Sequence, residues 1–232
     1  MMSVAKQHAE WLNLIDINGP FLTIEVLMRA FPQGLDGLDA EAARMIRGAY
    51  LEWEDNLQQR RPDLAVHRAW IELVLKRFLE YGEGALLEGQ AISDSLSANV
   101  ATHGEVLRPE YVLVNPPGRL ETGKPRLIVN TYPANQGLEK PVAKARWTAS
   151  PATRMKQLLG ATSAQLGLVT NGQQWMLVNA PHGETVGYIT WYANLWLEEK
   201  STLQAFRSLL HARRFFGVAE TQTVEALLKE SA

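Results

Sequence analysis

Basic side chains gather in the stretch from residue 124 to residue 156. This stretch has seven basic residues and one acidic residue, a local net charge of +6 in a chain whose total is −2. Phosphate binding needs such a cluster of positive charge, because each phosphate that a cation neutralises releases counterions. The alternatives are a solvated face or a surface that docks on an acidic neighbouring domain. The candidate DNA-binding residues are Lys124, Arg126, Lys140, Lys144, Arg146, Arg154 and Lys156.

Two residues of this stretch can also be interpreted as structural. Trp147 could stack on a base, but a tryptophan directly before a helix more often packs against the core, and we favour packing. Arg154 falls in the first turn of an expected helix, where a positive charge opposes the helix dipole unless it has an anionic partner. That partner could be a DNA phosphate, Glu110 or another internal acid.

Strands and a helix are expected to position these residues. The β-rich runs at 110–115 and 126–132 are separated by proline- and glycine-containing turns, as two adjacent strands would be. Ser150 and Pro151 predict an N-cap and the first residue of a helix that continues from about Ala152 to Leu159. The other elements expected after residue 90 are strands at 98–102 and 185–191 and a long helix at 195–215.

A β-hairpin is predicted directly after that helix. The apolar runs Leu166–Thr170 and Trp175–Val178 lie on either side of Asn171 and Gly172. Asn-Gly supplies the two positive-φ residues that a type I′ turn requires. The first run is continuously apolar, which predicts a strand buried on both faces.

The N-terminal part of the chain has the periodicity of helices. Asp39 and Asp63 are the expected N-caps of two of them. His8 and His67 have no partner at helical spacing, so we expect surface or satisfied core residues rather than metal ligands. The expected helices are at 4–17, 21–30, 39–60 and 64–81.

Composition is typical of a soluble globular protein. With 232 residues and 46% hydrophobic content, the chain can bury a full core. No apolar run approaches the length of about 18 residues that a membrane span needs, and no secretory leader is apparent. Cysteine is absent, which removes disulfides, thiolate metal sites and cysteine nucleophiles. A cytoplasmic location is the simplest expectation.

Several segments resemble restriction enzymes. The hairpin sequence GLVTNGQQWMLV resembles the hairpin that follows the active-site strands in nuclease domains of the PD-(D/E)xK superfamily. Together with EWLNLIDINGPFL, FPQGLD and SPATRMKQLL, it looks like the N-terminal region of large Eco57I-class DNA methyltransferases, of the type IIG restriction and phage-defence kind. The resemblance covers nearly all of the chain. It implies an α+β fold, with a helical region at 1–90 and a restriction-endonuclease-like sheet flanked by helices at 91–232.

The same resemblance makes a demand on particular positions. A PD-(D/E)xK nuclease needs a carboxylate at the start of its second core strand, and on the third strand a carboxylate two residues before a lysine; the acids hold Mg²⁺. Glu110 matches the first position, although it could also be an ordinary strand-edge acid. Asn130 and Tyr132 occupy the positions of the second ligand and the cation, which an amide and a phenol cannot replace. We therefore expect a degenerate site with no catalytic residue and no metal ligand.

The preferred hypothesis is a non-catalytic nuclease-like module of a DNA restriction-modification or phage-defence adenine methyltransferase, contributing DNA-backbone contacts or scaffolding. Two alternatives remain: an active Mg²⁺-dependent endonuclease with other ligands, and a protein-interaction module without a DNA role. No cofactor is expected in this segment, and S-adenosylmethionine would bind only in a downstream domain. Asn115-Pro116-Pro117 is followed by Gly118, not by the tyrosine of an adenine-methylase motif. The expected partners are DNA and a downstream methyltransferase domain or other defence-system subunits, without a membrane.

Overall fold

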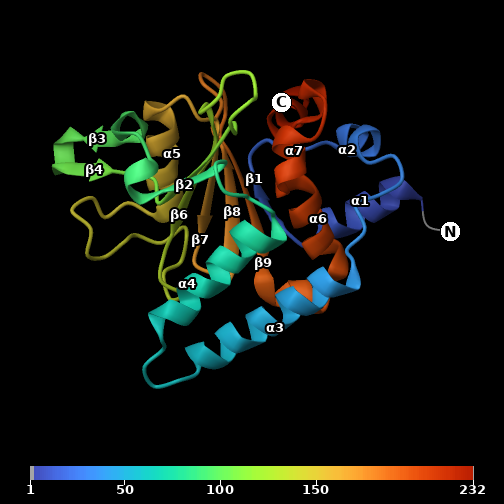
Figure 1. Cartoon of the computed structure of the whole chain (residues 1–232), viewed down its shortest axis with the longest axis horizontal. Helices are drawn as coiled ribbons and strands as arrows, with labels where there is room; N and C mark the ends of the chain where they lie inside the picture. The colour runs from blue at the N-terminus through green and yellow to red at the C-terminus, as the bar shows by residue number, and fades with distance from the viewer. Residues whose placement is uncertain (1–2, 232) are drawn as a thin grey trace. The chain divides into compact units, whose positions relative to one another are not determined.

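The structure, a computed structural model, describes residues 3–231 and combines helices with a mostly antiparallel seven-stranded sheet (Figure 1). The mixed α+β class expected from the sequence is thus confirmed. The sheet has the strand order β1-β9-β8-β7-β6-β5-β2, and β3 and β4 form a separate two-stranded sheet. The strands are β1 (Asp16–Asn18), β2 (Leu86–Glu88), β3 (Ala98–Val100), β4 (Glu105–Leu107), β5 (Tyr111–Val114), β6 (Pro125–Thr131), β7 (Leu166–Thr170), β8 (Gln174–Asn179) and β9 (Gly187–Tyr192).

The helices begin where the sequence supplies caps. Asp39, Asp63 and Ser150 each accept a hydrogen bond from a backbone N–H in the first turn of the helix that follows, as expected. The α-helices are α1 (Val4–Leu12), α2 (Ile24–Ala30), α3 (Ala40–Leu57), α4 (Leu64–Glu72), α5 (Pro151–Ala161), α6 (Lys200–Leu210), α7 (Ala212–Phe216) and α8 (Val224–Glu230). A π-helix at Leu73–Phe78 continues α4, and short 3₁₀ turns lie at Gly89–Ala91, Asp94–Leu96, Ala101–His103, Ala193–Leu197 and Glu220–Gln222.

The chain forms two compact units, which do not follow the single boundary expected near residue 90. Among the described residues, the helical unit consists of 3–16, Phe21–Tyr81 and 191–231, and the sheet unit consists of Ile17–Pro20 and Gly82–Thr190. The C-terminal helices belong with the N-terminal ones because they complete the same aromatic core. Within that core, the Trp196 ring lies 6.2 Å from Trp70 and 4.8 Å from Phe206 between ring centroids.

Two histidines accept hydrogen bonds from tryptophans of this helical core. Nδ1 of His67 accepts a hydrogen bond from Nε1 of Trp53 at 3.0 Å, and Nδ1 of His8 accepts one from Nε1 of Trp11 at 3.1 Å. Burial lowers the pKa of His8, so its imidazole is neutral at neutral pH. His8 is fully buried and His67 is half-buried against this core, whereas the sequence left open a surface or a core position for each.

Two expected helices end earlier than their sequence periodicity suggests. The first stops at Leu12, and the Asn-Gly-Pro sequence that resembled a helix end belongs instead to β1 and the turn after it. Gly19 has φ +89°, and a Cβ there would lie 2.5 Å from the Val186 carbonyl oxygen. Only glycine therefore allows the backbone at position 19 to pass this close to Val186. The long C-terminal helix breaks at His211, whose ψ of 144° is extended and which caps α7 by accepting from the Arg213 N–H.

The sheet unit is built around two hairpins and one crossover. Strand β5 pairs with β6 antiparallel, β6 pairs with β7 parallel, and β7 pairs with β8 antiparallel. Helix α5 provides the crossover between the two parallel strands. All five residues of β7 are buried, which confirms the expected strand covered on both faces.

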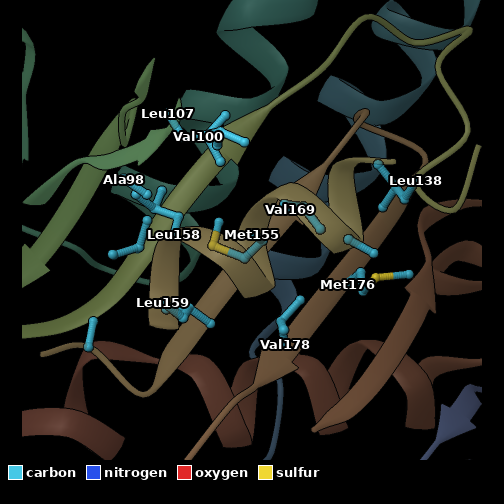
Figure 2. Close-up of a cluster of buried hydrophobic side chains, with 13 residues drawn as sticks. Ala98, Val100, Leu107, Leu138, Met155, Leu158, Leu159, Val169, Met176 and Val178 are labelled. Atoms are coloured by element: carbon cyan, nitrogen blue, oxygen red, sulfur yellow. The ribbon is translucent and has the colours of Figure 1, made fainter. Parts of the chain in front are cut away.

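Helix α5 packs against this sheet through an apolar face (Figure 2). Met155, Leu158 and Leu159 are each 2% exposed and contact buried side chains from β7, β8 and the β3–β4 hairpin. The close approach depends on Gly167 of β7, because a Cβ there would lie 2.4 Å from the sulfur of Met155. The packing fixes where the N-terminal turn of α5 and the loop before it lie in the sheet unit.

The turn between β7 and β8 differs from the expected type I′. The Asn171 backbone N–H donates to the Gln174 carbonyl oxygen, so the two central residues of the turn are Gly172 and Gln173. Of these, only Gly172 has a positive φ, +86°, and a positive φ at the first central residue alone is the pattern of a type II′ turn. Asn171 acts through its side chain instead: its Oδ1 accepts from the backbone N–H groups of Gln173 at 3.0 Å and Gln174 at 2.7 Å. Asn171 therefore caps the turn from the first corner position.

Replacement of Asn171 by alanine should destabilise the protein by about 2 kcal/mol, since it removes the acceptor for two N–H groups around a side chain that is 4% exposed. Urea unfolding followed by circular dichroism measures the loss. Asn171→Asp keeps the acceptor and should recover part of the stability. Equal stability of all three proteins would contradict the role given to this side chain.

Candidate nucleic-acid interface

The β5–β6 hairpin brings three of the predicted site residues together. Tyr111 pairs with Val129 across the two strands, so Glu110 and Asn130 lie at the same end of the hairpin, and Tyr132 comes two positions after Asn130. A small cavity of about 90 Å³ opens at this end and is lined in part by Asn130, Tyr132, Arg108 and Arg154. The positions that the resemblance assigned to catalysis are therefore neighbours.

Glu110 is engaged by its own hairpin. Its Oε2 accepts hydrogen bonds from the backbone N–H of Thr131 at 2.9 Å and from the Thr131 hydroxyl at 2.6 Å. Asn130 donates through Nδ2 to the carbonyl oxygen of Arg108 at 3.0 Å. Burial raises the pKa of Tyr132, so the side chain at the expected cation position is a neutral phenol at neutral pH. These contacts hold the end of the hairpin together.

Arg154 has an internal anionic partner, Glu105 of β4. The guanidinium forms an ion pair with the Glu105 carboxylate, and the two side chains are 13% and 18% exposed. Nη1 of Arg154 also donates to the carbonyl oxygen of Trp147 at 2.7 Å. The backbone N–H of Trp147 donates to Oε2 of Glu105 at 2.7 Å. The hydrogen bond from Arg154 lowers the pKa of Glu105 more than any other contact. Of the partners considered from the sequence, the internal acid is the one found.

Glu105 itself was not singled out from the sequence. It is separated from Arg154 by 49 positions and stands in a short strand with no chemical motif. The only signal was indirect: an arginine in the first turn of a helix needs a nearby acid. That argument predicts a partner but not its position in the chain.

Two further basic residues are held at the β5–β6 turn. Nζ of Lys124 lies 2.7 Å from Oε2 of Glu121. Nη1 of Arg126 donates to Oδ1 of the buried Asn115 at 3.0 Å, while the Asn115 amide donates to two carbonyl oxygens of the turn. Lys124 and Arg126 thus stabilise this turn.

Lys124 is itself exposed but is paired with Glu121. The other four candidates are solvent-exposed and form no ion pair among the described residues. Three lie in the segment 132–150 between β6 and α5, which we call the basic loop, and the fourth lies on α5, at an open groove of about 670 Å³ beyond the end of that helix. We refer to these four as the exposed cations: Lys140, Lys144, Arg146 and Lys156.

The basic loop has no regular secondary structure, yet the turn of the β7–β8 hairpin anchors it. Nδ2 of Asn171 donates to the carbonyl oxygen of Gln136 at 2.9 Å. The Gln136 amide in turn donates to the carbonyl oxygens of Gly137 and Lys140, each at 2.9 Å. At the other end of the loop, Nη1 of Arg146 donates to the Gly104 carbonyl oxygen at 2.9 Å. The exposed cations of the loop therefore project from a held backbone.

Within residues 3–231, no cluster of three or more histidine or acidic side chains is arranged to hold a metal ion. In the same part of the chain, none of the helices has both the length and the apolar character that crossing a bilayer requires.

Comparison with protein-family models gives no match, and comparisons with curated proteins and with solved structures give no significant match either.

Proposed function

We propose that this chain is a non-catalytic, nuclease-like module that contacts the DNA backbone, as part of a DNA-modifying methyltransferase of a restriction or phage-defence system. The observation that carries the proposal is the separation of the basic stretch into three members engaged by acidic or amide side chains and four exposed members that form no ion pair within residues 3–231. Arg154 is neutralised by Glu105. The exposed cations remain available to solvent on an anchored loop and on α5. Phosphates are the natural partners of such a surface.

The arrangement of the sheet supports the nuclease-like part of the proposal. Two antiparallel strands, a crossover helix and a strand parallel to the second follow one another as β5, β6, α5 and β7. The order expected for a PD-(D/E)xK core is three strands, a helix and two strands, and β4, β5, β6, α5, β7 and β8 follow one another in that order, with β4 in the separate two-stranded sheet. The contacts of Glu110 with Thr131, and the amide and phenol at positions 130 and 132, support a structural rather than a catalytic role for this end of the hairpin.

DNA binding should be electrostatic and indifferent to base sequence. In a salt series on a duplex, the log–log slope of the binding constant is about −0.9 per phosphate engaged. Replacing all four exposed cations by alanine should flatten that slope and weaken binding to every duplex alike. Fluorescence anisotropy with two unrelated duplexes measures both effects.

A matched control removes the same charge from the helical unit. Arg44, Arg47, Arg68 and Arg77 are exposed residues of α3, α4 and the π-helix. Their replacement by alanine should leave the salt slope unchanged. If the two fourfold variants bind DNA equally well, the basic loop is a solvated or protein-docking face and the proposal fails.

The nuclease alternative is tested with the same protein. We expect no cleavage of duplex DNA in the presence of Mg²⁺ or Mn²⁺, because the amide of Asn130 and the phenol of Tyr132 offer neither a second carboxylate ligand nor a cation. Metal-dependent cleavage that disappears in Glu110→Gln would establish the active endonuclease instead.

A further inference from the structure

Two aromatic rings, one of them from the basic loop, stack at the surface of the sheet unit. The rings of His103 and Trp147 have centroids 5.9 Å apart and an interplanar angle of 22°. Trp147 is half-buried and packs against the apolar cluster under α5, as its position before the helix predicted. His103 lies at the end of the 3₁₀ turn between β3 and β4 and is exposed. We call this pair the aromatic platform; its outer ring is the histidine.

The aromatic platform is held by hydrogen bonds from both of its segments. The backbone N–H of Trp147 donates to Glu105, which follows the β3–β4 turn, and the backbone carbonyl oxygen of Trp147 accepts from Arg154. Arg146 donates to the carbonyl oxygen of Gly104, the residue after His103. The two rings are thus positioned before any ligand arrives, which reduces the entropy cost of binding.

The charge around the platform is favourable for an anion. Arg146 is adjacent to Trp147 in the chain, and Lys144 lies two positions further back; both are exposed. The nearest acid of the hairpin, Glu105, is compensated by its ion pair with Arg154. An exposed ring with cations beside it offers a base-stacking surface and phosphate contacts together.

We infer that the aromatic platform stacks an unpaired base of single-stranded DNA on the His103 ring, while Lys144 and Arg146 contact the flanking phosphates. This inference rests on the proposed function and specifies its substrate as DNA with exposed bases. In a duplex, the bases cover one another's faces, so the platform cannot add to duplex binding. Because every base has a π-face, the stacking is tolerant of sequence.

The test uses the whole chain and three fluorescent ligands: a thymidine strand of about twelve nucleotides, an abasic strand with the same number of phosphates, and a duplex. Stacking of one base on an aromatic side chain corresponds to roughly a fivefold to hundredfold change in affinity. His103→Ala should weaken binding of the thymidine strand by that factor and leave the abasic strand and the duplex unchanged. His103→Phe, which keeps an aromatic face, should restore most of the affinity.

Two controls separate the platform from charge and from histidine in general. His182→Ala removes an exposed histidine from the loop before β9 and should change none of the three affinities. Arg146→Ala should weaken binding of all three ligands, because all three carry phosphates. A ribonucleotide strand of the same length offers the same base faces; binding at least ten times tighter than the thymidine strand would assign the platform to RNA and overturn the DNA assignment.

The outcomes distinguish this inference from the proposed function. If His103→Ala binds the thymidine strand as tightly as the parent, the stacking role is wrong, while salt-dependent binding of the duplex would still support backbone contacts. If the parent binds none of the ligands even at low salt, the proposed function fails and the platform has no DNA to stack.

Discussion

Gly187→Ala should lower the free energy of unfolding by about 3 kcal/mol. Gly187 begins β9, and a Cβ at this position would lie 2.2 Å from the carbonyl oxygen of Pro20, the residue that ends the turn after β1. The atom in the way belongs to the backbone, so no side-chain rotation can make room. We expect either a displaced Ile17–Pro20 segment or a strained β9, and guanidinium unfolding monitored by tryptophan fluorescence measures the cost.

Gly160 provides the matched control for this substitution. It lies within α5, and a Cβ there would meet no atom within 4 Å. Gly160→Ala should therefore stabilise the protein by about 0.5–1 kcal/mol, because alanine is the better helix former. Opposite signs for the two glycines would support the close approach at Gly187; two losses of similar size would instead point to a general intolerance of alanine.

Breaking the Glu105–Arg154 pair should also have a large effect. Arg154→Met leaves a mostly buried carboxylate without its main partner and removes a hydrogen bond to Trp147, so we expect a loss of about 2–3 kcal/mol at neutral pH. The double variant Glu105→Gln with Arg154→Met should be less destabilised than the sum of the two single changes, because neither variant side chain is charged. Thermal unfolding of the four proteins completes the cycle.

The dependence on pH follows from Glu105. Its pKa is lowered in the folded protein, first of all by the hydrogen bond from Arg154, so the unfolded chain binds more protons in acid. The ionised Glu105 carboxylate contributes fully to the free energy of unfolding above the ordinary glutamate pKa of about 4.3. That contribution is lost as the pH falls from there through the lower pKa of the folded state. The stability difference between the parent and Glu105→Gln should therefore shrink below about pH 4.

An exposed ion pair serves as the comparison. Lys124 and Glu121 also lie within ion-pair distance, but their side chains are 48% and 58% exposed. Lys124→Met should cost no more than about 1 kcal/mol. If Arg154→Met is equally mild, and if it weakens DNA binding as much as the loss of an exposed cation, then Arg154 is a phosphate contact and its structural role is mistaken.

Local signals in the sequence predicted the elements that local chemistry determines. The caps at Asp39, Asp63 and Ser150, and the two strands of the β7–β8 hairpin, need only neighbouring residues, and they lie where the sequence indicated. Asn171 was recognised as a turn residue, although the turn uses its amide oxygen and not a positive φ.

Contacts between distant segments determined the rest. The helical periodicity continues to residue 17, but β1 begins at Asp16, and Gly19 is required where the backbone passes Val186. The last helices join the first ones through a shared aromatic core, which no local pattern reveals. The same holds for the site: the basic stretch was visible, but its division into engaged and exposed cations depends in part on Glu105, far away in the chain.

The anchoring of the basic loop by Asn171 has a consequence for affinity. A free segment of this length would lose much conformational entropy when its cations are fixed on phosphates, at about 1–2 kcal/mol for each residue ordered. The hydrogen bond from Asn171 to Gln136 imposes part of that order during folding. In the proposed DNA complex, Asn171 would therefore contribute to affinity through the order of the basic loop, and Asn171→Ala should weaken binding although the sequence keeps every cation.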